Sequence, residues 1–333
     1  MTAQQGGDMI RLLEVHLVLA ACAASLTCAA PAYGQTYPTK PVRMVVPYAA
    51  GGGTDTLARM IAPRLMDVLG QSIVIDNRPG VDGIVGTEVV ARSNPDGYTL
   101  LITSSSYAIN PALGRKLPYS TKDFAPITQT ANQQLLLVVH PSLQAASVKD
   151  LIAYAKANPD QLNYGASSNA AGLPMELFKT MTGTRIQQIP YKGSGQMIID
   201  LLGGQVQLSM SGAVAAIPHV KSGKLRPIAI GDSKRSAFLP DIPTIAESGV
   251  PGYQAVIWSG MLAPTNTPRP IIDKLNAEIV RIVQTRDFKD KLLQLGSDSV
   301  GSTPEEWGRF IEDEIVKWAK IAKAAGMSIE SGK

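Results

Sequence analysis

Short apolar runs that resemble buried strands alternate with segments of helical periodicity along most of this chain. Val42–Val46 is an apolar, β-branched run that ends at Pro47, which predicts a buried strand. Between Thr56 and Leu69 the apolar residues keep helical spacing, and Gly70 predicts the end of that helix. Strands separated by helices of about 10–15 residues are typical of right-handed crossovers in parallel sheets. The pattern therefore predicts an α/β fold with parallel-rich sheets flanked by helices.

The alternation continues to the C-terminal part of the chain. There, Thr303 precedes a proline and two glutamates, which is typical of a capped helix start. We expect the aromatic residues of this last helix, among them Trp307 and Trp318, to pack against their own domain. Further strands are predicted at residues 73–75, 99–103, 135–139, 162–165, 185–189, 206–210, 225–230 and 256–262, and further helices at 83–92, 148–157, 173–181, 197–202 and 270–284.

The length of 333 residues suits two domains, but no flexible linker divides the chain. Two domains would therefore have to be joined by strands that cross between them. We expect these crossings at Leu135–Val139 and Val256–Met261, since each lies near a change in pattern. One domain would then comprise residues 35–136 and 257–333, and the other residues 137–256.

The first 34 residues differ in character from the rest. Arg11 precedes an alanine-rich apolar stretch from Leu17 to Ala32, which ends in the small residues typical of signal-peptide cleavage. We expect residues 1–34 to be removed and the mature protein to be periplasmic, with lipidation at Cys22 as the less favoured alternative. Cys28 is the second cysteine of the chain and lies in the same segment. The mature chain would thus have no cysteine, which avoids wrong disulfides in an oxidising compartment.

Charge is small and evenly spread. The net charge is +4, and no run of five or six like charges occurs. Neither a nucleic-acid partner nor a membrane-binding stripe is therefore expected.

The sharpest local motif is the glycine-rich loop Pro47–Asp55, PYAAGGGTD, between a predicted strand and a predicted helix. Glycines let the backbone approach a ligand closely, and a helix start offers unpaired amides and the positive end of a dipole. The loop matches neither a Walker A sequence nor a GxGxxG fingerprint. Two interpretations stay open: an anion site, or a tight turn in which Thr54 or Asp55 caps the helix.

Three further polar loops follow predicted strands: Thr103–Tyr107, Ala166–Gly172 and Tyr191–Gly195. In open α/β sheets, ligands bind outside the carboxyl ends of the strands. Hydroxyl groups, amides and loop N–H groups are donors that suit a carboxylate. The four loops together therefore favour the anion site.

Catalytic motifs are not evident. His140 and His219 lie beside no GxSxG elbow, HExxH helix or metal-ligand spacing. Lys192 could form a Schiff base, but a loop lysine near an anion is favoured, and Asp55 could be a base, but its place at a helix start favours capping. We expect no enzyme, no metal and no cofactor; an exported enzyme acting on a small organic acid stays the alternative.

Short motifs recur in order from about residue 36 to residue 326. With the glycine-rich loop they are Tyr37–Arg43, Asp76–Gly80, Pro95–Leu100, Pro190–Gly193, Asp200–Gln205, Gly223–Arg226, Leu239–Thr244 and Gly301–Glu306. In these motifs the chain resembles the Bug receptors, the substrate-binding proteins of bacterial tripartite tricarboxylate transporters.

The resemblance implies a type II-like periplasmic binding protein of two hinge-linked domains, expected as a monomer. It implies a small mono- or dicarboxylate ligand, held largely by main-chain amides and ordered water, for uptake through the membrane subunits of the transporter. A receptor that signals to a sensor is the other alternative. The expected ligand-binding residues are Tyr48, Ala50, Gly51, Gly52, Thr54, Asp55, Ser104, Ser105, Ser106, Tyr107, Ser167, Ser168, Asn169, Ala171, Tyr191, Lys192 and Ser211.

Two departures from the family pattern limit this transfer. The loop Gly165–Leu173 is shorter than usual and lacks the histidine often found after it. Met210-Ser211-Gly212 stands where many members carry Phe-Asp-Asn. Because that carboxylate is a possible partner for a ligand ammonium, its loss predicts an amine-free acid.

Overall fold

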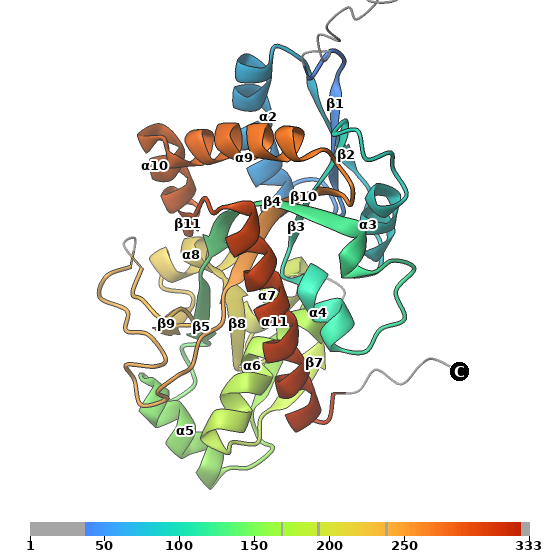
Figure 1. Cartoon of the computed structure of the whole chain (residues 1–333). Coiled ribbons are helices and arrows are strands. Elements are labelled where there is room, and N and C mark those ends of the chain that lie inside the picture. Colours follow the sequence, from blue (N-terminus) through green and yellow to red (C-terminus); the bar gives the residue numbers. More distant parts are fainter. Residues whose placement is uncertain (1–36, 168, 192–193, 237–238, 328–333) are drawn as a thin grey trace, which may run out of the picture. The chain divides into compact units, whose positions relative to one another are not determined.

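The computed structural model in Figure 1 describes residues 37–167, 169–191, 194–236 and 239–327. Lys40–Lys333 form one compact unit. The expected signal peptide, both cysteines, Ser168 and Lys192 lie outside the described residues.

The first of two sheets has six strands in the order β11-β4-β10-β3-β1-β2. β1 pairs in parallel with β2 and β3, whereas β10 runs antiparallel to β3 and β4, and β11 antiparallel to β4. Val45 and Val46 of β1 are fully buried, as a continuous apolar run predicts for an inner strand. The strands are β1 (Val42–Val46), β2 (Ile73–Asn77), β3 (Thr99–Ser104), β4 (Phe124–Gln133), β10 (Ile257–Pro264) and β11 (Ser297–Ser299).

The second sheet has five strands in the order β7-β6-β8-β5-β9. β6 is parallel to β7 and β8, and β5 is antiparallel to β8 and β9. All five residues of β5 are buried. The strands are β5 (Leu135–Val139), β6 (Asn163–Ala166), β7 (Gln187–Pro190), β8 (Leu208–Gly212) and β9 (Arg226–Ile230).

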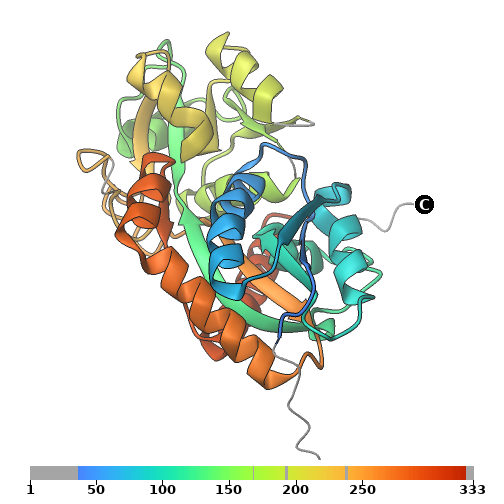
Figure 2. The same cartoon turned by 90° about the horizontal axis from the view of Figure 1, so that it is seen from above.

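Helices connect most of the strands and cover both sheets. α9 and α11 both pack against β4, and α2 packs against β2 and against α9 (Figures 1 and 2). The helices are α2 (Gly53–Leu69), α3 (Ile84–Ala91), α4 (Ser106–Ala112), α5 (Val148–Ala157), α6 (Asn169–Thr182), α7 (Ser194–Leu202), α8 (Ala213–Lys221), α9 (Arg269–Gln284), α10 (Arg286–Gln294) and α11 (Pro304–Ala324), with 3₁₀ turns η1 (Val81–Gly83) and η2 (Thr121–Asp123).

The α/β architecture predicted from the alternating pattern is confirmed, with differences in detail. The sheets are mixed rather than parallel throughout, because β5 and β10 run antiparallel to their neighbours. β4, β11, α4 and α10 were not predicted. α6 already begins at Asn169, so the second half of the predicted loop Ala166–Gly172 is the first turn of a helix.

The two predicted crossing strands each lie within one sheet. β5 belongs wholly to the second sheet and β10 to the first. The chain instead passes between the sheets at Gln134, whose N–H donates to the carbonyl of Gly296 and whose carbonyl accepts from the N–H of Ala213. It returns just before Ile257, where β10 begins.

Candidate functional site

Two cavities adjoin at Ser104 and Ile257, which line both. The first, of about 170 Å³, has polar side chains from the start of α2, β4, β10 and β11. The second, of about 160 Å³, has a more apolar lining from both sheets. The first is lined by Gly51, Gly53, Thr54, Thr56, Leu57, Ser104, Ala131, Gln133, Ile257, Ser259, Leu292, Leu295 and Ser297. The second is lined by Ser104, Ser105, Ser106, Ile109, Leu135, Ser167, Ala171, Pro174, Met197, Met210, Ser211, Gly212, Ala215, Val256, Ile257 and Trp318.

The glycine-rich loop brings the start of α2 to the first cavity. Gly51 has a φ of +84°, which favours glycine, and Gly52 is the N-cap residue of α2. The first hydrogen bond of the helix runs from the N–H of Thr56 to the carbonyl of Gly52. The amides of Gly53 and Thr54 therefore have no partner within the helix, and both residues line the cavity. Together with the helix dipole, these amides form a site suited to an anion.

Asp55 holds this loop in shape. Its carboxylate is 2% exposed and accepts hydrogen bonds from Gly51 N at 2.8 Å, Arg59 Nε at 2.9 Å and Asn77 Nδ2 at 2.9 Å. Burial acts to raise the pKa of Asp55, but the hydrogen bonds from Arg59, Gly51 and Asn77 outweigh it and lower the pKa to about 2. Asp55 lines neither cavity, so the structure gives it a positioning role instead of the expected ligand contact.

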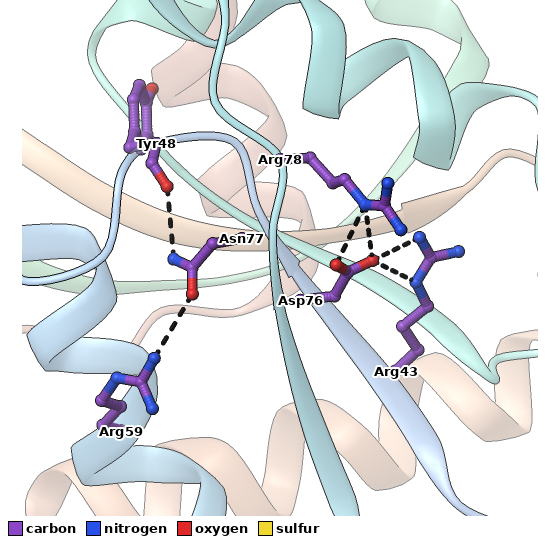
Figure 3. Close-up of polar contacts among 6 residues, drawn as sticks. All are labelled: Arg43, Tyr48, Arg59, Asp76, Asn77 and Arg78. Carbon is purple, nitrogen blue, oxygen red and sulfur yellow. Dashed lines mark hydrogen bonds and ion pairs between the residues drawn. The ribbon is translucent and has the colours of Figure 1, made fainter.

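Asn77 ties the loop to the end of β2. Its Nδ2 donates to the carbonyl of Tyr48 at 3.2 Å, and its Oδ1 accepts from Arg59 at 3.3 Å (Figure 3). Beside it, Asp76 accepts from Arg43 Nε at 2.7 Å and Arg78 Nε at 3.0 Å. Burial would raise the pKa of Asp76, but these two arginines lower it. The motif Asp76–Gly80 thus supports the loop from outside the cavities.

Tyr48 connects the loop to the end of β3. Its hydroxyl oxygen accepts from Ser104 Oγ at 2.9 Å and from Ser104 N at 3.3 Å. Ser105 and Ser106 follow and line the second cavity, and Ser105 Oγ accepts from the N–H of Trp258 at 3.0 Å. The structure therefore brings three of the expected serines to the cavities.

Tyr107 does not join them. Its ring is 2% exposed in an apolar core and packs edge-on to Phe124, with centroids 5.5 Å apart. Burial raises the pKa of Tyr107 well above its usual value. As the second residue of α4 it faces the core rather than either cavity, contrary to its expected ligand contact.

On the opposite side, Ser167, Ala171 and Ser211 line the second cavity. Ser211 is buried, and its hydroxyl donates to Ser209 Oγ at 3.2 Å. Asn169 begins α6. Both segments that depart from the family pattern, the loop Gly165–Leu173 and Met210-Ser211-Gly212, therefore contribute residues to the second cavity.

Tyr191 lies elsewhere. Its hydroxyl donates to Asp200 Oδ2 at 2.9 Å, and it lines neither cavity. Burial and then this hydrogen bond raise the pKa of Tyr191 to about 12. Tyr191 is therefore a neutral donor that links the end of β7 to α7, in place of the expected ligand contact. Ala50, also expected at the site, is exposed in the loop and lines neither cavity.

Several lining residues were missed by sequence analysis. Gln133, Ser259 and Ser297 reach the first cavity from three strands that are adjacent only in the folded sheet. Met197 and Trp318 supply part of the apolar lining of the second. Nothing in their local sequence marks them, because non-local strand pairing brings them to the site.

No acidic, basic or histidine side chain of the described residues lines either cavity. Within the same residues no group of histidine, cysteine, aspartate or glutamate could hold a metal ion. His140 is bonded locally, with its Nδ1 2.6 Å from Ser142 Oγ. The lining offers neutral hydrogen-bond donors and acceptors at one end and apolar surface at the other. None of the helices in the described part of the chain is both long and apolar enough to cross a membrane.

Comparison with known proteins gives consistent matches. The family model described as Tripartite tricarboxylate transporter family receptor matches residues 57–327. Protein BugT of Bordetella pertussis is 39% identical over 97% of this chain and 100% of its own length. Rpa4515 of R. palustris, solved with adipate, is 40% identical with a TM-score of 0.77, over 87% of this chain and 98% of that one. MatC of Rhodopseudomonas palustris, solved with bound malate, is 30% identical with a TM-score of 0.73, over 86% of this chain and 99% of that one.

Proposed function

Since this chain belongs to the tripartite tricarboxylate transporter receptor family, we propose that it binds a small mono- or dicarboxylate between its two sheets for uptake. Receptors of this family are periplasmic and bind carboxylate solutes. The single observation that carries the proposal is the start of α2, where the amides of Gly53 and Thr54 lie free of helical partners beside a cavity. A carboxylate at this point would meet hydrogen-bond donors, and no negatively charged side chain among the described lining residues would repel it.

The relatives support an acid as the ligand. The R. palustris protein was solved with adipate and MatC with malate, and neither acid carries an amine. The ligand-binding residues that we propose from the expected set are Gly51, Thr54, Ser104, Ser105, Ser106, Ser167, Ala171 and Ser211, with Tyr48, Gly52 and Asp55 holding the loop. The ligand would then pass to the membrane subunits of a tripartite transporter.

We place the two domains at residues 35–136 with 257–333, and at 137–256, and expect the ligand to close them about the crossing at Gln134. This division follows the sheets, since β1–β4, β10 and β11 belong to one and β5–β9 to the other. We also propose that the protein is exported with removal of residues 1–34 and that it is a monomer. An exported enzyme is less favoured, because no acid and base pair lines the described cavities.

Ligand identification tests the function directly. Mass spectrometry of acid released from freshly purified protein, with a thermal-shift screen of mono-, di- and tricarboxylates, should identify an acid that raises the unfolding midpoint. A panel without any stabilising acid, together with purified protein that carries none, would contradict a carboxylate receptor.

Gly53→Leu tests the loop. A Cβ at Gly53 would have only ordinary contacts, the nearest 3.6 Å from Gln133 Nε2, so the fold should tolerate the change. The leucine would fill part of the first cavity and should weaken binding more than about tenfold, equivalent to 1.4 kcal/mol. Gly203→Leu is the control, since Gly203 has similarly ordinary contacts and lines neither cavity. Equal affinity of both variants, measured by calorimetry, would remove the loop from the site.

A further inference from the structure

Gln133 lies where the chain leaves the first sheet. It is the last residue of β4, and its backbone pairs with Ile257 of β10 on one side and with Ser297 of β11 on the other. All three residues line the first cavity. Two neighbouring strands therefore fix the position of the Gln133 Cα beside the cavity.

The side-chain amide of Gln133 lies close to two glycines, one at the start of α2 and one at the end of β8. A Cβ added to Gly53 would be 3.6 Å from Gln133 Nε2, and one added to Gly212 would be 2.9 Å from Gln133 Oε1. Gly53 begins α2, and Gly212 ends β8. Because neither glycine has a side chain, the amide occupies the space between the helix start and the second sheet.

This amide has no hydrogen-bond partner among the residues that the structure describes, unlike its neighbours in sequence. Gln129 Nε2 donates to Asn132 Oδ1 at 2.7 Å, and Gln134 Nε2 donates to Asp298 Oδ2 at 3.0 Å. Gln129 and Gln134 are buried, whereas Gln133 is half-buried beside the cavity. A polar group of this kind needs a partner, and the cavity is where one can be supplied.

We propose that Gln133 is a ligand-contacting residue whose Nε2 donates a hydrogen bond to the carboxylate held at the start of α2. The inference rests on the proposed function, since it names a side chain for the same acid. The neighbouring amides of Gly53 and Thr54 bind one carboxylate oxygen, and Gln133 binds the other. A neutral amide recognises the carboxylate without adding charge to a lining that has none among its described residues.

Gln133→Glu tests the contact, because it keeps the shape of the side chain and replaces the donor by a carboxylate. Affinity for the acid found to bind the wild type should fall roughly ten- to hundredfold, as for a lost hydrogen bond to a charged group with repulsion added. Gln133→Met, which removes the amide without adding charge, should lose less. Calorimetry measures both, and the unfolding midpoint of each variant without ligand shows that the fold is kept.

Asn132→Asp is the matched control. It adds the same charge one residue earlier, on the opposite face of β4, where its oxygen can still accept from Gln129. Its affinity should stay within about twofold of the wild type, a change below 0.5 kcal/mol. Unchanged binding by Gln133→Glu, or an equal loss in Asn132→Asp, would overturn the contact while leaving the carboxylate receptor intact. A wild-type protein that binds no acid would overturn the proposed function and this inference together.

Discussion

The sequence around Asp55 is compatible with several roles for this residue. From sequence it could cap a helix, act as a base or contact a ligand. In the structure its carboxylate is 2% exposed and accepts hydrogen bonds from Gly51, Arg59 and Asn77. Asn77 comes from β2, so its contribution depends on the pairing of β1 with β2 and could not be derived from the loop alone. The carboxylate therefore fixes the conformation of the loop at the anion site without lining the cavity.

The ionised carboxylate of Asp55 should make the free energy of unfolding depend on pH in the acidic range. Its folded pKa of about 2 is below the ordinary value near 3.9, so its contribution is present above about pH 4 and lost as the pH falls through about 2. Because Arg59 is half-exposed, we expect a contribution of about 1–2 kcal/mol. Urea unfolding should show Asp55→Asn less stable than wild type near pH 6, with the difference shrinking toward about pH 2.

Asp67→Asn provides the comparison. Asp67 is exposed on the same helix and forms no ion pair with the described residues, so its loss should change little at either pH. A stability difference between wild type and Asp55→Asn that stays constant from pH 6 down to about 2 would contradict the assigned hydrogen bonds.

At the scale of elements, α11 was predicted correctly as a helix but not in its packing. Thr303 and Glu306 form the expected reciprocal cap, with Thr303 Oγ1 accepting from Glu306 N at 3.2 Å. Its aromatic residues, however, divide between two cores. Trp307 packs with the core of the first sheet and Trp318 with that of the second, and α11 contacts both β4 and α6 (Figure 1). A helix of 21 residues is about 30 Å long, enough to span both.

Glu314 of α11 should contribute strongly to the free energy of unfolding. It is 5% exposed and accepts from Trp258 Nε1 at 3.0 Å and Trp318 Nε1 at 2.8 Å, besides Lys317. Glu314→Ala leaves two buried indole N–H groups unpaired, which should cost about 2–4 kcal/mol in the free energy of unfolding. Denaturant unfolding with tryptophan fluorescence measures the loss.

Two further variants locate the cause of that loss. Glu314→Gln keeps an acceptor oxygen and should lose less. Glu312→Ala, at an exposed position of the same helix, should change stability by less than about 0.5 kcal/mol. Equal losses for Glu314→Ala and Glu312→Ala would show that the indoles find other partners.

The elements also show what sequence could and could not predict. β1 and β5 were predicted because their apolar runs are continuous, which buried strands require. β4 was missed because five of the ten residues in its sequence FAPITQTANQ are polar, which interrupts the apolar run. Two of its residues bond instead to a distant one: Thr128 Oγ1 donates to the carbonyl of Ser302 at 2.8 Å, and the backbone N–H of Gln129 donates to Ser302 Oγ at 3.0 Å. The same non-local pairing hid Gln133, whereas the glycine loop was recognisable because its chemistry is local.

At the scale of the whole molecule, the two sheets meet closely where the chain crosses between them. Gly296, before β11, accepts a hydrogen bond from the N–H of Gln134, whose carbonyl accepts from Ala213 at the start of α8. A Cβ added to Gly296 would lie 2.4 Å from Ala213 Cβ and 3.0 Å from Ile217 Cδ1. The approach of the α10–β11 turn to α8 therefore requires glycine at this position.

Gly296→Ala should force these elements apart. Its φ of +66° adds backbone strain to the contact, and Gly183→Ala isolates the two effects, because Gly183 has a φ of +64° with open space around it. Strain alone should be similar in both variants, whereas the clash with α8 should cost the Gly296 variant about 1–3 kcal/mol more in the free energy of unfolding. Chemical denaturation measures this difference. Calorimetry with the bound acid should show weaker binding only for Gly296→Ala, because the second cavity is lined from both sheets. Equal stability of the two variants would mean that the sheets can shift at this junction without a cost in free energy. The closure of the two domains around the ligand would then have to depend on another part of the molecule.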